Sequence, residues 1–179
     1  VFVKATPELE LTESQEIVFG QTVTLTALTT AADPFIYWTA QGKIFCSECE
    51  SITVSPEDDI TYTVIVEDAN GCTIQDEVTI MVRKDCLEED FFIPNMISPN
   101  NDGANDEFYI TSEIPTNLKH LRIYDRWGEQ MFETSDWNTH WRGDYRGQGV
   151  NPGVYVYYLE AICPNGDPFK KVGNITVLK

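Results

Sequence analysis

Apolar and polar residues alternate along several stretches in the first half of the chain. The stretch 21–27 places Val23, Leu25 and Ala27 on one side and threonines on the other, which is the pattern of a strand with one buried face. The apolar stretch that ends at Trp38 predicts the next core strand, with the indole at its centre. These periods of two indicate β-sheet.

A β-hairpin is predicted further along the first half. Two β-rich stretches, 61–66 and 77–82, flank the dipeptide Asn70-Gly71, which supplies the positive φ angles that a tight turn needs. We therefore expect residues 1–85 to form an immunoglobulin-like sandwich. The stretch 55–82 also resembles the PKD-like or Ig-like repeats of large surface proteins.

The second half shows strand patterns as well. The stretches 119–124 and 129–133 flank a turn in which Gly128 is free to adopt positive φ. The stretch 154–162 is apolar on both alternating faces, which predicts a central strand buried on both sides. A last strand follows over 169–178, and no segment repeats the apolar spacing of a long helix.

The charged run 83–90 has no periodicity, which favours a short linker. A length of 179 residues suits two small domains. We therefore expect an all-β chain of two tandem Ig-like β-sandwich domains, residues 1–85 and 86–179.

Composition and charge exclude several classes of protein. No apolar run is long enough for a transmembrane helix, and no N-terminal signal pattern is present. We therefore expect no membrane insertion and interpret the chain as the C-terminal part of a longer precursor. The net charge is −17, with 15 acidic and 4 basic residues in 1–85 and 14 and 8 in 86–179. Such a surface repels phosphate backbones, so we expect no nucleic-acid binding.

Five cysteines are consistent with an oxidising environment. Cys46 and Cys49 form a C-x-x-C pair, which is compatible with a redox pair, half of a zinc site or a local disulfide. Strand and turn residues surround the pair and both histidines are far away in sequence, so we favour the local disulfide. Cys86 and Cys163 are expected to staple the second domain, with Cys72 either unpaired or competing for Cys86.

The segment 92–108 reads FIPNMISPNNDGANDEF and packs prolines, a glycine and a polar turn cluster between apolar ends. It resembles the gliding-motility-associated C-terminal domain, the type B sorting domain of the type IX secretion system of Bacteroidetes. The resemblance continues through 121–129, 153–157 and 173–179. Trp141-Arg142-Gly143 departs from the family's usual W-D-G, as Met96-Ile97 does from its small residue and Phe.

The resemblance implies a non-catalytic secretion signal. It implies passage through the type IX translocon, recognition by an outer-membrane barrel protein of the PorP/SprF type, and secretion or display at the cell surface. The candidate recognition residues are Pro94, Asn95, Asp102, Gly103, Asn105, Asp106, Arg126, Trp127, Gly128 and Lys179.

Two polar clusters allow other interpretations. Oxygen-bearing side chains surround Gly103 with an incomplete resemblance to a calcium loop, at Asn100, Asp102, Asn105 and Asp106. We favour a turn that hydrogen-bonds its own backbone, with no cofactor beyond weakly bound calcium.

Aromatic and arginine side chains gather between 126 and 146, namely Trp127, Trp137, Trp141 and Tyr145 with Arg126, Arg142 and Arg146. They fit either a packed sandwich rim, which we favour, or a sugar-stacking platform. The alternative function is therefore a carbohydrate-binding or adhesive surface module. His120 and His140 lie in no catalytic motif, and we expect no enzyme activity.

Overall fold

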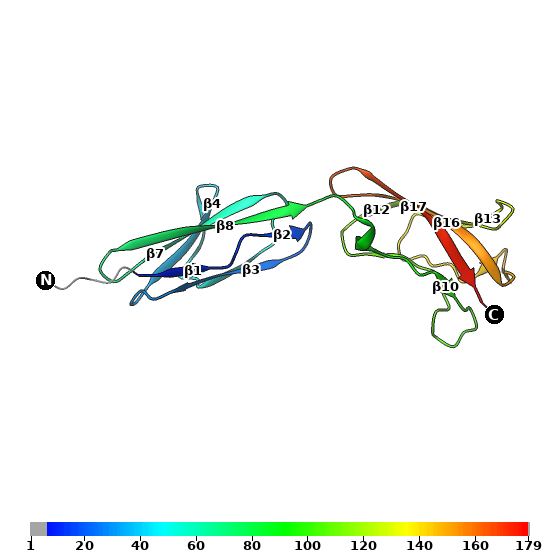
Figure 1. Cartoon of the computed structure of the whole chain (residues 1–179), viewed down its shortest axis with the longest axis horizontal. Coiled ribbons are helices and arrows are strands. Elements are labelled where there is room, and N and C mark those ends of the chain that lie inside the picture. Colours follow the sequence, from blue (N-terminus) through cyan, green and yellow to red (C-terminus); the bar gives the residue numbers. More distant parts are fainter. Residues whose placement is uncertain (1–6, 179) are drawn as a thin grey trace. The chain divides into compact units, whose positions relative to one another are not determined.

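The computed structural model describes residues 7–178 and consists of β-strands and one 3₁₀ turn, without an α-helix in that range. Contacts divide the chain between Arg83 and Lys84 into two units (Figure 1). The expected all-β, Ig-like fold is confirmed.

The first unit is a sandwich of two sheets. The smaller sheet has the order β1 (Leu9–Leu11), β3 (Val23–Thr29) and β6 (Ser51–Val54). The larger sheet has the order β2 (Gln15–Val18), β8 (Thr73–Arg83), β7 (Ile60–Glu67), β4 (Phe35–Ala40) and β5 (Lys43–Ser47).

The predicted pattern of buried positions holds in this unit. Leu25 and Ala27 of β3 are buried against the other sheet, while Val23 is half-buried. Trp38 is fully buried at the centre of the core, and its Nε1 donates to the Cys49 carbonyl at 2.9 Å. The indole therefore brings its own polar atom into the core with a partner.

The second unit has one large sheet and several short pairings. The large sheet has the order β10 (Met96–Ile97), β17 (Pro168–Val177), β16 (Gly153–Ile162), β12 (Asn117–Tyr124) and β13 (Gln130–Thr134). The short pairings are β9 (Phe91–Phe92) with β11 (Thr111–Ser112), β14 (Asp144–Tyr145) with β15 (Gln148–Gly149), and a bridge between Phe108 and Trp141. Phe91, Phe108 and Trp141 of these segments pack into the core of the unit. The predicted hairpin β12–β13 forms, with Gly128 at φ 83°.

Two expectations are corrected in this unit. β16 is central, as predicted, but it is not buried on both sides. Tyr155, Tyr157 and Leu159 face the core, whereas Val156 and Tyr158 on the outer face are only half-buried. Apolar residues therefore occur on the outer face of the sheet without being buried there.

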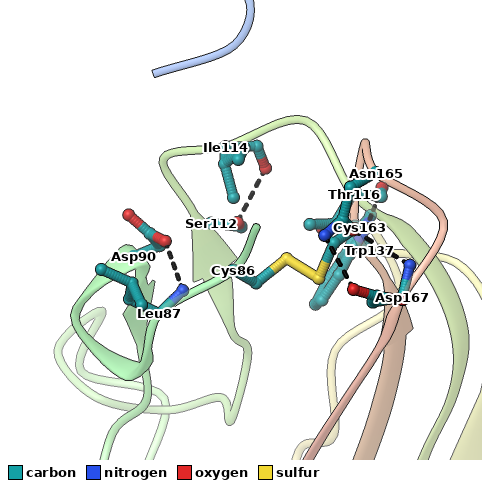
Figure 2. Close-up of a disulfide and its surroundings, with 10 residues drawn as sticks. All are labelled: Cys86, Leu87, Asp90, Ser112, Ile114, Thr116, Trp137, Cys163, Asn165 and Asp167. Carbon is teal, nitrogen blue, oxygen red and sulfur yellow. Dashed lines mark hydrogen bonds between the residues drawn. A yellow bond between two sulfur atoms is a disulfide. The ribbon is translucent and has the colours of Figure 1, made fainter. Parts of the chain in front are cut away.

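The expected linker is also wrong for residues 86–90, which are part of the second unit. A 3₁₀ turn, η1 (Glu88–Asp90), ends in a buried aspartate whose Oδ2 accepts from the Leu87 amide at 2.7 Å. Cys86 is bonded to Cys163 (Figure 2), and the Phe91 ring stacks on Phe169 with centroids 4.1 Å apart. These contacts fasten the segment to the β16–β17 hairpin.

The remaining cysteines lie in the first unit. Cys46 and Cys49 form a disulfide at the crossing from β5 to β6, which agrees with the favoured interpretation. Cys72 is a free thiol and is exposed in the β7–β8 turn.

Candidate recognition surface

The first residues of the Pro- and Gly-rich segment extend the sheet beside the last strand. β10 pairs with β17 in parallel, and the Asn95 carbonyl accepts from the Thr176 amide at 2.9 Å. The Ile97 carbonyl accepts from the Leu178 amide at the same distance. Asn95 thus has a backbone role that ties two of the family-like motifs together.

The polar turn 100–106 satisfies its own hydrogen bonds. Asp106 Oδ1 accepts from the amides of Asn100 and Asn101 at 3.0 and 2.7 Å, and its Oδ2 accepts from the Gly103 amide at 2.8 Å. The Ala104 amide, together with the Asn100 side chain, lowers the pKa of the Asp102 carboxyl. This arrangement is the self-bonded turn that the residue types favour. Within residues 7–178, no three His, Cys, Asp or Glu side chains cluster as metal ligands would.

Two further family-like residues close the end of the segment. Phe108 and Trp141 exchange backbone hydrogen bonds at 2.7 and 3.0 Å, and both rings are buried. A Cβ on Gly143 would lie 3.0 Å from Pro99 Cγ, so only glycine fits there without a shift. The Trp-x-Gly motif therefore packs against the Ser-Pro motif. Arg142, which stands between Trp141 and Gly143 in the sequence, is exposed.

The turn between β12 and β13 presents a second part of the surface. Asp125 Oδ1 accepts from the amides of Trp127 and Glu129, each at 2.8 Å. Gly128 has the positive φ that such a turn requires. The Trp127 side chain is left 86% exposed, which is unusual for the largest apolar residue.

The structure separates the sequence-predicted residues into two places. Pro94, Gly103, Asn105 and Asp106 line one hollow of about 380 Å³. Arg126 and Trp127 line another of about 220 Å³, with no lining residue in common. Asn95 and Asp102 are exposed near the first hollow, Gly128 lies in the turn, and Lys179 is outside the described residues.

Sequence reasoning missed a polar cluster beside the first hollow. Glu107 Oε2 is 2.7 Å from His140 Nδ1, and Glu107 Oε1 is 2.7 Å from an Arg142 Nη atom. The His140 hydrogen bond, with the Arg142 charge, lowers the pKa of the Glu107 carboxyl. Tyr109 stacks on the His140 ring with centroids 4.8 Å apart. No local sequence pattern predicts this contact, because Glu107 and His140 are 33 residues apart.

The aromatic residues of 126–146 do not form one sugar-stacking platform. Trp141 is buried and its Nε1 donates to the Asp144 carbonyl at 2.8 Å. Trp137 is half-buried, with Nε1 donating to the Thr116 carbonyl at 3.1 Å (Figure 2). The Arg146 guanidinium lies over the Tyr145 ring, 4.8 Å from its centroid. The tryptophans therefore mostly serve packing.

Several solved structures are distantly similar to this chain. SGBP-B of the Bacteroides ovatus mixed-linkage glucan utilization locus is 13% identical with a TM-score of 0.38, and the match covers 98% of this chain and 48% of that one. The Ig1-2 module of the Drosophila receptor tyrosine phosphatase DLAR is 13% identical with a TM-score of 0.39, covering 98% and 100%. Latent PorU of Porphyromonas gingivalis is 16% identical with a TM-score of 0.34, covering 96% and 20%. The chain thus spans about half of SGBP-B and a fifth of PorU, and no curated protein matches it significantly.

Sequence comparison with protein families is more informative. Residues 91–177 match the model of the CHU_C type IX secretion signal domain. The matched range begins directly after η1 and includes every strand from β9 to β17. Such a domain implies interaction with the type IX machinery and export across the outer membrane to the surface or the medium. No helix among the described residues is long and apolar enough to cross a membrane. The second unit of this chain, over residues 91–177, is therefore a type IX secretion signal domain of the CHU_C type.

Proposed function

We propose that this chain is a non-catalytic export address. Residues 86–179 act as the type B sorting domain of a longer secreted or surface protein, and residues 1–85 act as an Ig-like spacer. The observation that carries the proposal is the family match over residues 91–177. The partner is a barrel protein of the PorP/SprF type, working with the type IX translocon.

The contacts between motifs support a folded signal. The segment that starts the matched range pairs with the strand that ends it, through the Asn95–Thr176 and Ile97–Leu178 hydrogen bonds. Residues about 80 positions apart are thus paired at one edge of the sheet, where β10 is the outermost strand and β17 its neighbour. Such an address is complete only after the whole domain has been synthesised and folded.

A reporter experiment tests the proposal. A fluorescent protein with a periplasmic signal peptide is fused to residues 1–179, 84–179 or 1–83 in a bacterium with a type IX system. We expect the first two fusions outside the outer membrane and the third retained in the periplasm. Deleting the genes for PorP/SprF-type proteins should abolish export. Export of the 1–83 fusion, or retention of the full fusion, would contradict the proposal.

A further inference from the structure

Two hollows on the second unit share one lining residue, the aromatic side chain of Tyr109. Tyr109 lines the hollow of about 380 Å³ with Phe92 and Met96, and it also lines a hollow of about 510 Å³ with Trp137 and His140. We call these two hollows, together with the side chain that they share, the Tyr109 groove. It joins the start of the family-matched segment to the polar cluster around Glu107.

The groove exposes large apolar side chains. Phe92 is 63% exposed, Met96 47% and Tyr109 40%. Clustered exposure of this kind marks interaction surfaces, whereas scattered single residues do not. Thr111, the cross-strand neighbour of Phe92, is also exposed and lines the larger hollow.

Its central wall is held in place before any partner binds. The His140 ring is stacked on Tyr109 and hydrogen-bonded to Glu107, which also pairs with Arg142. On the other side, Trp137 is anchored through its Nε1. Side chains that are already ordered lose little entropy on binding, so the groove is preorganised.

The charge around the groove is negative. None of the residues lining the two hollows is lysine or arginine, whereas Asp106 and Glu107 are among them. Asp102 is exposed on the adjoining turn, and Arg142 lies nearby with its charge paired with Glu107. Residues 86–179 carry 14 acidic and 8 basic residues. A partner with positive charge fits this surface best.

We propose that the Tyr109 groove is the docking site for a protein segment of the export machinery that carries lysine or arginine next to large apolar side chains. This inference rests on the proposed export function and specifies its partner. Apolar side chains of the segment cover Phe92, Met96 and Tyr109, and its basic groups face Asp102 and Asp106.

Export of the reporter fused to residues 1–179 tests the apolar contacts. Phe92→Ser and Met96→Ser should each lower the exported fraction about tenfold, as loss of an interface hot spot does. Val172→Ser is the matched control, because Val172 is 58% exposed on the outer face of the large sheet, and it should export normally. Melting temperatures within about 2 °C of the parent exclude misfolding, since exposed substitutions change stability little.

Two substitutions of opposite charge at Thr111 test whether the partner segment is basic. Thr111→Lys and Thr111→Glu add side chains of similar length, so only the lysine variant should repel a basic segment and reduce export. Equal losses in both variants would overturn the basic partner. Normal export of Phe92→Ser and Met96→Ser, while the parent is exported, would overturn the groove but leave the export function standing. Binding of the full chain to a glycan array, lost in Tyr109→Ala, would assign the groove to saccharides instead and overturn the proposal.

Discussion

Tyr157 and Gly173 face each other across β16 and β17, and the tyrosine ring occupies the space that a side chain at residue 173 would need. A Cβ built on Gly173 would lie 2.7 Å from Tyr157 Cε1. Tyr157 is buried, and the centroid of its ring lies 5.6 Å from the centroid of the Phe108 ring. One pair therefore joins the Gly-x-Tyr-x-Tyr strand to the glycine that opens the last motif.

We predict that Gly173→Ala destabilises the second unit by about 1 to 3 kcal/mol, because the methyl group displaces a packed ring. Urea unfolding monitored by tyrosine and tryptophan fluorescence measures the loss. Gly149→Ala is the control, since a Cβ there meets nothing within 4 Å and Gly149 lacks a positive φ. Equal stability of the two variants would show that the ring moves aside at no cost.

The two disulfides should differ in how much each contributes to the free energy of unfolding. Cys86 and Cys163 are 77 positions apart, whereas Cys46 and Cys49 are 3 apart. In the chain-entropy account a longer loop gains more, so Cys86→Ser with Cys163→Ser should cost about 2 to 4 kcal/mol and the other pair less. Chemical unfolding of both double variants decides this.

Peptide mapping without reduction should find Cys72 alkylated, and a Cys72–Cys86 link would refute the pairing.

The sequence predicted those parts of the fold that depend on local patterns of residues. Alternation located the buried side of β3, and Asn70-Gly71 located the β7–β8 turn. Apolar content misled at β16, because it does not reveal whether a second layer covers each face. The polar cluster of Glu107 and His140 depends on a contact between distant segments, which no spacing rule contains.

Acid should remove the stabilisation that the ionised carboxylate of Glu107 gives to the fold. Its pKa in the folded protein is lowered from 4.5, chiefly by the His140 hydrogen bond. A lowered pKa stabilises the fold fully above the unfolded value, and this stabilisation is lost as the pH falls through the folded value. The melting temperature of the parent should exceed that of Glu107→Gln near neutral pH and approach it as the pH falls through the lowered pKa of Glu107. A constant difference across this range would contradict the ion pair's role.

Calcium should have little effect on stability. The oxygens of Asp106 and Asp102 already accept amide hydrogen bonds within the 100–106 turn, so a calcium ion, which needs these oxygens as direct ligands, would compete with those hydrogen bonds. A dissociation constant of about 1 mM would add only about 0.4 kcal/mol at equal calcium concentration. Thermal melting with and without calcium measures this. A rise of many degrees at sub-millimolar calcium, abolished by Asp102→Ala, would establish a true site.

Export should depend on the folded edge and not on the motif alone. Thr176→Pro removes the amide that donates to Asn95 and leaves that carbonyl without its partner, at a cost of about 1 to 3 kcal/mol. Thr176→Val keeps the amide and suits a strand. We expect the proline variant to lose both stability and reporter export, and the valine variant to keep both. Normal export of a destabilised proline variant would contradict this prediction, because pairing of β10 with β17 would then be dispensable for recognition.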